Sequence, residues 1–120
     1  MPATVLVVED DALISAMIVS SLLDEGFAVR VADSADDALR HLDDAIDILF
    51  TDINLSGTVD GVALAREVRR LRPDLPVVYA SGTRMSSDLG PLVSMSVFLS
   101  KPYDPRQVCA LLRRMTSVRH

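Results

Sequence analysis

The sequence predicts an α/β protein in which helices cover both faces of a parallel β-sheet. Short apolar segments alternate with longer helical patterns five times along the chain, as expected for repeated strand–helix units. The segments "VLVV", "ILF" and "PVVYA" are apolar at successive positions, which is typical of strands buried on both faces. With 120 residues, the chain can build one hydrophobic core, so we expect a single domain over residues 1–120.

Five strands and five helices are predicted. The strands cover residues 4–8, 28–32, 46–51, 77–81 and 97–100, and the helices cover 12–25, 35–44, 61–71, 85–94 and 105–117. Ser34 and Asp60 are placed to cap the second and third helices, and Pro105 suits the first turn of the last. Gly90 and Pro91 interrupt the segment 85–94, so this helix should be short, bent or broken.

The composition excludes several classes of protein. The net charge is −5, with 17 acidic against 12 basic residues, so no basic face for nucleic acid is expected. Cys109 is the single cysteine, which rules out an internal disulfide, and its apolar neighbours indicate a core position. No basic region precedes an apolar run at the N-terminus, and the uncharged stretch 12–23 is too short to span a bilayer. We therefore expect a soluble cytoplasmic protein that does not contact a membrane.

Polar side chains gather where the predicted strands end. In an open parallel sheet, ligands bind beyond the carboxyl ends of the strands. The residues that follow the first, third, fourth and fifth strands are therefore the candidate site: Glu9, Asp10 and Asp11; Asp52 and Asn54; Ser81 and Gly82; Lys101 and Pro102.

The chemistry of this set favours a magnesium-dependent phosphoryl-transfer site. Two carboxylates about 4 Å apart repel by about 4 kcal/mol at an intermediate effective dielectric constant, so three of them need protons or a cation. Oxygen ligands with room for water suit Mg²⁺ better than zinc. With its charge screened, Asp52 would act as the nucleophile, while Lys101 and Ser81 would each hold one phosphoryl oxygen.

Four motifs resemble a known family. In chain order they are "VLVVEDD", "LFTDINL", "VVYASG" and "FLSKP". Together, at these spacings, they resemble the receiver domain of bacterial two-component response regulators over essentially the whole chain. The resemblance implies the flavodoxin-like doubly wound fold, (βα)5, with strand order 2-1-3-4-5.

The resemblance also implies a metal site. Glu9 and Asp10 match the acidic pair of the family, and Asp10 would be the more direct Mg²⁺ ligand. Asp52 matches the phosphoacceptor and would also ligate the metal. Asn54 matches the position whose backbone carbonyl completes the metal shell.

The remaining matched residues concern the phosphoryl group and its readout. Ser81 matches the hydroxyl residue that binds the phosphoryl group, and Lys101 matches the family lysine. Pro102 follows it through a bond that is often cis in this family. Phe98 matches the aromatic residue whose rotamer follows phosphorylation, so Ser81 and Phe98 would form the switch. Gly82 stands where alanine is usual, which opens access to the phosphoryl group.

The function implied is that of a stand-alone receiver without an output domain. It would accept a phosphoryl group from a sensor histidine kinase or a histidine phosphotransfer protein onto Asp52. It would then signal by binding an unknown downstream protein or by passing the group on, as a monomer or weak homodimer. It would catalyse only its own phosphorylation and dephosphorylation. The apolar helix 12–23 either docks the histidine-bearing partner or is thoroughly buried; from the residues alone, Ile14, Ile18 and Leu22 should face the sheet.

The sequence departs from the family in two places. The loop "INLSGTVDG" is one residue longer than usual and has Ser56 where proline is common. Met95 and Ser96 replace the usual Gly-Ala before the last strand. The departures affect the metal loop and the face that commonly reads out phosphorylation.

One alternative remains open, and two others are disfavoured by particular residues. A pseudo-receiver would use the same fold as a binding module without phosphorylation. A haloacid-dehalogenase-type phosphatase would need a second aspartate two residues after the nucleophile, where this chain has Asn54. A flavin-binding module would need a phosphate-cradling loop after the first strand, where this chain has acids.

Overall fold

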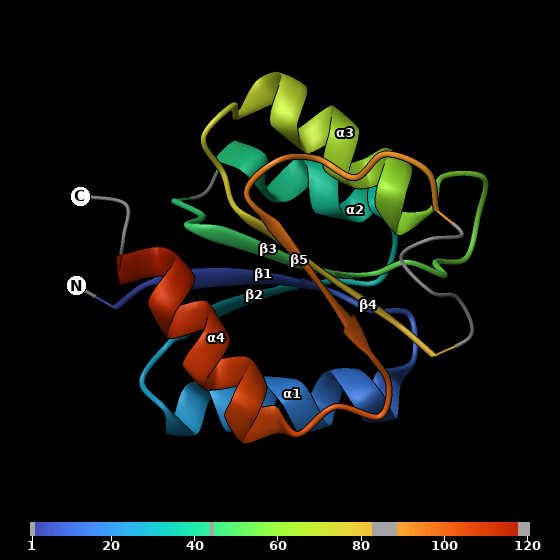
Figure 1. Cartoon of the computed structure of the whole chain (residues 1–120). Coiled ribbons are helices and arrows are strands. Elements are labelled where there is room, and N and C mark those ends of the chain that lie inside the picture. The colour runs from blue at the N-terminus through green and yellow to red at the C-terminus, as the bar shows by residue number, and fades with distance from the viewer. Residues whose placement is uncertain (1, 44, 83–88, 118–120) are drawn as a thin grey trace.

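The computed structural model describes residues 2–43, 45–82 and 89–117. It contains a five-stranded parallel sheet with the order β2-β1-β3-β4-β5, so the predicted doubly wound fold is confirmed. In Figure 1, α1 and α4 cover one face of the sheet and α2 and α3 cover the other. The strands are β1 (Thr4–Val8), β2 (Ala28–Ala32), β3 (Ile48–Asp52), β4 (Val77–Ser81) and β5 (Ser96–Ser100). The helices are α1 (Ala12–Asp24), α2 (Ala35–Arg40), the 3₁₀ turn η1 (His41–Asp43), α3 (Gly61–Leu71) and α4 (Pro105–Ser117).

The sheet separates two apolar layers. Leu6, Leu49 and Tyr79 pack with side chains from α2 and α3. Val7 and Phe50, on the opposite face, pack with side chains from α1 and α4. Every residue of the central strands β3 and β4 is buried, as the continuous apolar runs predict.

The helix ends follow the expected capping chemistry. The hydroxyl of Ser34 accepts the backbone N–H of Asp37 at 3.1 Å, and Asp60 Oδ1 accepts that of Ala63 at 2.9 Å. Pro105 opens α4. These contacts satisfy backbone donors that no helical turn can reach, so the predicted caps are confirmed.

Several predicted boundaries need correction. The strand predicted over 46–51 runs from Ile48 to Asp52, because the Asp47 carboxylate accepts the Thr4 N–H at 2.8 Å in place of a strand carbonyl. The last strand begins one residue earlier than predicted, at Ser96. The first helix ends at Asp24, not at residue 25. The second is α-helical only to Arg40; of residues 41–43, Leu42 alone is apolar, so the last turn has little to bury.

The interruption predicted at Gly90 and Pro91 is confirmed, but no part of the helix predicted over 85–94 remains in the residues that are described. Residues 89–95 form no helix, and residues 85–88 lie outside the described part of the chain. Gly90 has φ +71° and Met95 has φ 51°, while Pro91 lacks a backbone N–H. The side chains of Arg66 and Arg69 on α3 bind carbonyl oxygens of Pro91 and Ser94, so α3 holds this segment in its extended form.

Candidate functional site

The strand register brings the predicted site residues to one edge of the sheet. Val8 pairs with Thr51, Asp52 pairs with Ala80, and Ser81 pairs with Ser100. β1, β3, β4 and β5 therefore end side by side. Glu9 directly follows β1, Asp52 closes β3 and Ser81 closes β4, and all three are buried.

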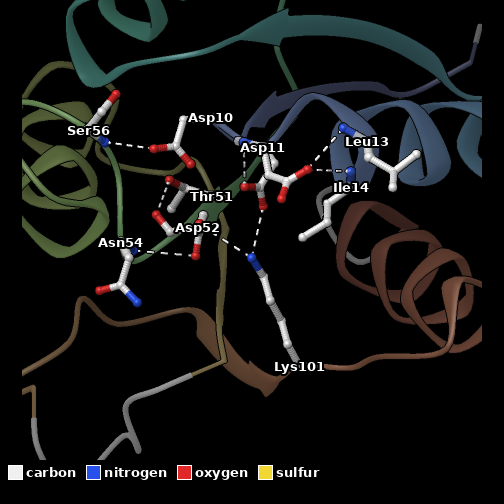
Figure 2. A network of polar contacts seen from close by, with 10 residues as sticks. Asp10, Asp11, Leu13, Ile14, Thr51, Asp52, Asn54, Ser56 and Lys101 are labelled. Carbon is white, nitrogen blue, oxygen red and sulfur yellow. Dashed lines mark hydrogen bonds and ion pairs between the residues drawn. The ribbon is translucent and has the colours of Figure 1, made fainter.

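The ammonium group of Lys101 bridges two buried acids. Its Nζ lies 3.0 Å from Glu9 Oε2 and 3.3 Å from Asp52 Oδ2. The Lys101 side chain is 18% exposed, and those of Glu9 and Asp52 are 4% and 6% exposed. Figure 2 shows Lys101 reaching up toward Asp52 from the chain after β5. Because water screens these charges little, the ammonium is a strong counter-charge for both carboxylates.

Burial and the hydrogen bond between Glu9 and Lys101 have opposite effects on the pKa values of these two residues. Burial raises the pKa of Glu9; the Asp11 N–H and the Lys101 ammonium oppose this rise, and the charge of Asp52 adds to it. Burial alone would lower the pKa of Lys101, but its hydrogen bond to Glu9 and the charges of Asp52 and Glu9 outweigh burial, so its pKa is raised. Lys101 is therefore protonated at neutral pH.

Backbone donors from the loop after β3 orient two of the carboxylates. The Asn54 N–H donates to Asp52 Oδ1 at 3.4 Å, and the Ser56 N–H donates to Asp10 Oδ2 at 2.9 Å. Both contacts are visible in Figure 2. The loop therefore fixes the acids of two different strands.

Three carboxylates form a cluster suited to a divalent cation. Glu9, Asp10 and Asp52 each offer an oxygen, and these oxygens lie within 4.8 Å of one another. Carboxylate oxygens at a partly open edge are the ligands that Mg²⁺ favours. The residues present therefore fit the metal that the sequence predicts.

The other predicted site residues lie around this cluster. The backbone carbonyl of Ser81 accepts the Lys101 N–H at 2.8 Å, which joins β4 to the chain after β5. An added Cβ at Gly82 would lie 3.6 Å from the Lys101 side chain, so Gly82 is adjacent to the site. The Lys101–Pro102 bond is cis. Phe98 is half-buried in the α2/α3 layer, away from the ion pairs.

Sequence reasoning missed three roles near Asp52. Asp11 caps α1, with Oδ1 accepting the N–H groups of Leu13 and Ile14 at 3.0 and 3.1 Å. The Thr51 hydroxyl donates to the Asp52 carbonyl at 2.9 Å. A Cβ on Gly61 would lie 2.1 Å from that same carbonyl oxygen, so α3 begins directly against the end of β3. The acid before an apolar helix signalled the cap, but nothing in the sequence signalled the contacts of the carbonyl.

An apolar cavity of about 290 Å³ adjoins the site on the α1 side. Ile14 and Met17 of α1 line it, together with Pro102 and Tyr103, and Lys101 reaches its wall. The ring of Tyr103 stacks edge-on against Phe50 at 5.7 Å, and its buried hydroxyl has no hydrogen-bond partner among the described residues. Burial, with the charges of Glu9 and Asp52, raises the pKa of Tyr103 to about 12.

The family of the chain is shown by comparison with known proteins. The response regulator receiver domain model matches residues 5–113, so the chain belongs to the response regulator receiver family. The transcriptional regulatory protein CreB of Escherichia coli K12 is 32% identical over 115 residues, which cover 93% of this chain and 50% of CreB. The nitrogen assimilation regulatory protein NtrX of Azorhizobium caulinodans is 30% identical over 114 residues, 92% of this chain and 25% of NtrX. The chain thus spans about half the length, or less, of these curated relatives.

Solved structures agree with this assignment. A response regulator receiver protein from Sinorhizobium medicae superposes with a TM-score of 0.91 at 30% identity, covering 99% of this chain and 98% of that one. NtrX from Brucella abortus, crystallised with ADP, gives a TM-score of 0.85 at 33% identity, covering 98% of this chain and 27% of NtrX. Among the described residues, no helix has the length and apolar character needed to cross a bilayer.

Proposed function

We propose that this chain is a phosphorylation-controlled receiver in which Asp52 accepts a phosphoryl group. The observation that carries the proposal is the position of Lys101 Nζ, 3.3 Å from Asp52 Oδ2, beside three clustered carboxylates. The donor would be a phosphohistidine on a sensor histidine kinase or a histidine phosphotransfer protein. The carboxylate attacks phosphorus, the P–N bond of the donor breaks as the P–O bond forms, and the imidazole leaves with a proton from solvent.

Residues around Asp52 would position the reacting groups. Asp52 lies on a strand that is buried throughout, so its carboxylate has little freedom to leave the in-line position. The Lys101 ammonium would hold one phosphoryl oxygen and the Ser81 hydroxyl another. Glu9, Asp10, Asp52 and the Asn54 carbonyl would hold Mg²⁺, whose charge would offset that of the incoming phosphoryl group.

The readout would run through the opposite side of the sheet from α1. Ser81 and Phe98 would act as the switch pair. The backbone N–H of Val93 donates to the Tyr79 hydroxyl at 3.3 Å, and Arg69 binds Ser94, so the segment before β5 is tied to the core. Movement of Ser81 toward a phosphoryl group would pull on this segment through β4.

The donor would dock on α1. Leu13 is 71% exposed and Met17 is 56% exposed, whereas Ile18 and Leu22 are buried. These exposed apolar side chains exclude a thoroughly buried helix and support docking of the donor on α1. The cavity beside this surface is lined by Met17 and Lys101, and Lys101 binds Asp52, so a histidine-bearing partner docked there would lie close to the phosphoacceptor.

We further propose that residues 1–120 form one receiver domain that acts through protein–protein contacts, as a monomer or weak homodimer. It would bind a downstream protein or pass the phosphoryl group on. Its catalysis would be limited to its own phosphorylation and dephosphorylation. The acidic net charge of −5 gives this domain no electrostatic attraction to nucleic acid.

The test is intact mass after incubation with acetyl phosphate. Wild-type protein with Mg²⁺ should gain one phosphoryl group, and the gain should disappear with EDTA or in Asp52→Asn, which keeps the shape of the side chain. Beryllofluoride should bind only when Mg²⁺ is present. If neither adduct forms in the folded protein, the chain is a pseudo-receiver, a binding module that acts without phosphorylation.

A further inference from the structure

Asp10 differs from the other two carboxylates of the cluster. Glu9 and Asp52 are buried, whereas Asp10 is exposed. A solvent-exposed carboxylate samples several rotamers, and a metal that binds it has to stop that motion. The Asp10 side chain is nevertheless held, because its Oδ2 accepts the backbone N–H of Ser56 at 2.9 Å, across 46 residues of sequence.

We infer that the Ser56 N–H positions Asp10 for Mg²⁺, an inference that rests on the proposed metal-dependent function. A carboxylate has two oxygens and about four lone-pair sites. The Ser56 N–H uses one site on Oδ2 and leaves the rest of the carboxylate to the metal. Figure 2 shows Asp10 between the Ser56 backbone and Asp52. Hydrogen bonds of this kind to a metal-binding carboxylate are worth about 10- to 100-fold in metal affinity.

The loop around Ser56 is built to hold this donor still. Leu55 before it is buried, and its N–H donates to the Ile53 carbonyl at 3.2 Å. Gly57 after it has φ +98°, a conformation that glycine adopts without strain, so the chain turns away directly after Ser56. The donor is therefore fixed between a buried anchor and a tight turn.

The contact depends on the backbone and not on the serine side chain. Any residue with an N–H could donate at position 56, but proline could not. Position 56 holds serine, so this chain has the donor that a proline there would remove. The Ser56 N–H therefore gives Asp10 a partner from the loop after β3.

The experiment is calorimetric titration of Mg²⁺ into wild type, Ser56→Ala and Ser56→Pro. Ser56→Ala keeps the N–H and should bind Mg²⁺ within about twofold of wild type, whereas Ser56→Pro should bind about 10-fold or more weakly. Urea unfolding in EDTA reports whether each variant is folded. Equal affinity in folded Ser56→Pro and Ser56→Ala would overturn the inference. Tighter binding by Ser56→Pro would also overturn it, because the N–H would then compete with the metal.

A second measurement does not depend on a proline variant. Amide hydrogen exchange of Ser56 in the wild-type protein should be slow without metal and slower still with Mg²⁺, because the metal would hold Asp10 in place. Fast exchange without metal, or exchange accelerated by Mg²⁺, would show that Asp10 leaves Ser56 and would overturn the inference. Absence of any Mg²⁺ binding by wild type overturns both this inference and the metal-dependent function, whereas the outcomes above leave that function intact.

Discussion

Replacement of Gly61 by alanine tests how closely α3 must approach Asp52. The new Cβ would lie 2.1 Å from the Asp52 carbonyl oxygen and 2.9 Å from the Asp52 carbonyl carbon and from Ile53 Cα. Real Cβ contacts essentially never fall below 3.0 Å, so backbone has to move by about 0.9 Å. All three atoms belong to the main chain, and no flexible side chain can move aside in their place.

The expected cost follows from the contacts that this movement breaks. Overpacking of this kind costs about 1–3 kcal/mol, and weakening of the Gly61 N–H bond to the Ile53 carbonyl, now 2.8 Å, costs about 1 kcal/mol more. Loss of glycine entropy in the unfolded chain returns about 0.5–1 kcal/mol. The free energy of unfolding should therefore fall by about 2 kcal/mol. Because a misplacement near 1 Å costs about 100-fold in rate, phosphorylation of Asp52 should slow by about that factor.

Gly82→Ala is the matched control. Its Cβ would meet only Lys101 side-chain carbons at 3.6 and 3.7 Å, an ordinary contact, so its stability should stay within about 0.5 kcal/mol of wild type. Urea unfolding in EDTA measures both stabilities, and intact mass against time in acetyl phosphate and Mg²⁺ measures the rate. If Gly61→Ala unfolds at the wild-type urea concentration and is phosphorylated at the wild-type rate, α3 does not begin against Asp52 as described.

Three further changes test other contacts. Tyr103→Phe removes a buried hydroxyl without a partner among the described residues, so urea unfolding at pH 7 should show a gain of about 1 kcal/mol. The pKa of Tyr103 is raised from 10 to about 12, so the unfolded chain loses the hydroxyl proton at lower pH than the folded protein does. The free energy of unfolding of wild type should therefore fall by about 2 kcal/mol between pH 10 and 12. The same fall in Tyr103→Phe would contradict this reasoning. Lys101→Met leaves Glu9 and Asp52 without their counter-charge, so thermal unfolding in EDTA should show that the free energy of unfolding falls by about 3 kcal/mol. Mg²⁺ should restore part of this stability. A loss of stability that Mg²⁺ does not change would show that the carboxylate cluster does not bind the metal. Arg69→Ala removes hydrogen bonds to Leu75 and Ser94 and should speed amide exchange in residues 89–95. Unchanged exchange would show that Arg69 does not hold that segment.

Much of the fold could be predicted because strands buried on both faces give continuous apolar runs in the sequence. The bounds of β1, β2 and β4 agree with prediction. The start of β3 could not be predicted, because the Asp47 side chain takes the place of a backbone partner. The form of residues 89–95 depends on Arg66 and Arg69, which bind it from 25 residues away. Local propensity predicts the break at Gly90 and Pro91 but not these long-range contacts.

The candidate site, like the fold, could be predicted from the sequence only in part. Strand-end reasoning grouped Glu9, Asp10, Asp52 and Lys101, because parallel strands end at one edge. The contacts of Gly61 and Ser56 could not be predicted in this way, because both depend on the backbone and no side-chain pattern marks them. The register and the loop path are needed to see them.

The separation of the two apolar layers has a consequence for how such a protein can diverge. Phe98 and Val93 pack on the α2/α3 side, while Ile18 and Val108 pack on the α1/α4 side, with the buried sheet between them. Substitutions in separate clusters that share no packing partner act almost additively. Under the proposed function, substitutions on α1 could change the phosphoryl donor and leave the response unchanged, and substitutions on the α2/α3 side could change the response and leave the donor unchanged. Because the buried sheet separates the two apolar layers, donor specificity and response specificity can evolve independently.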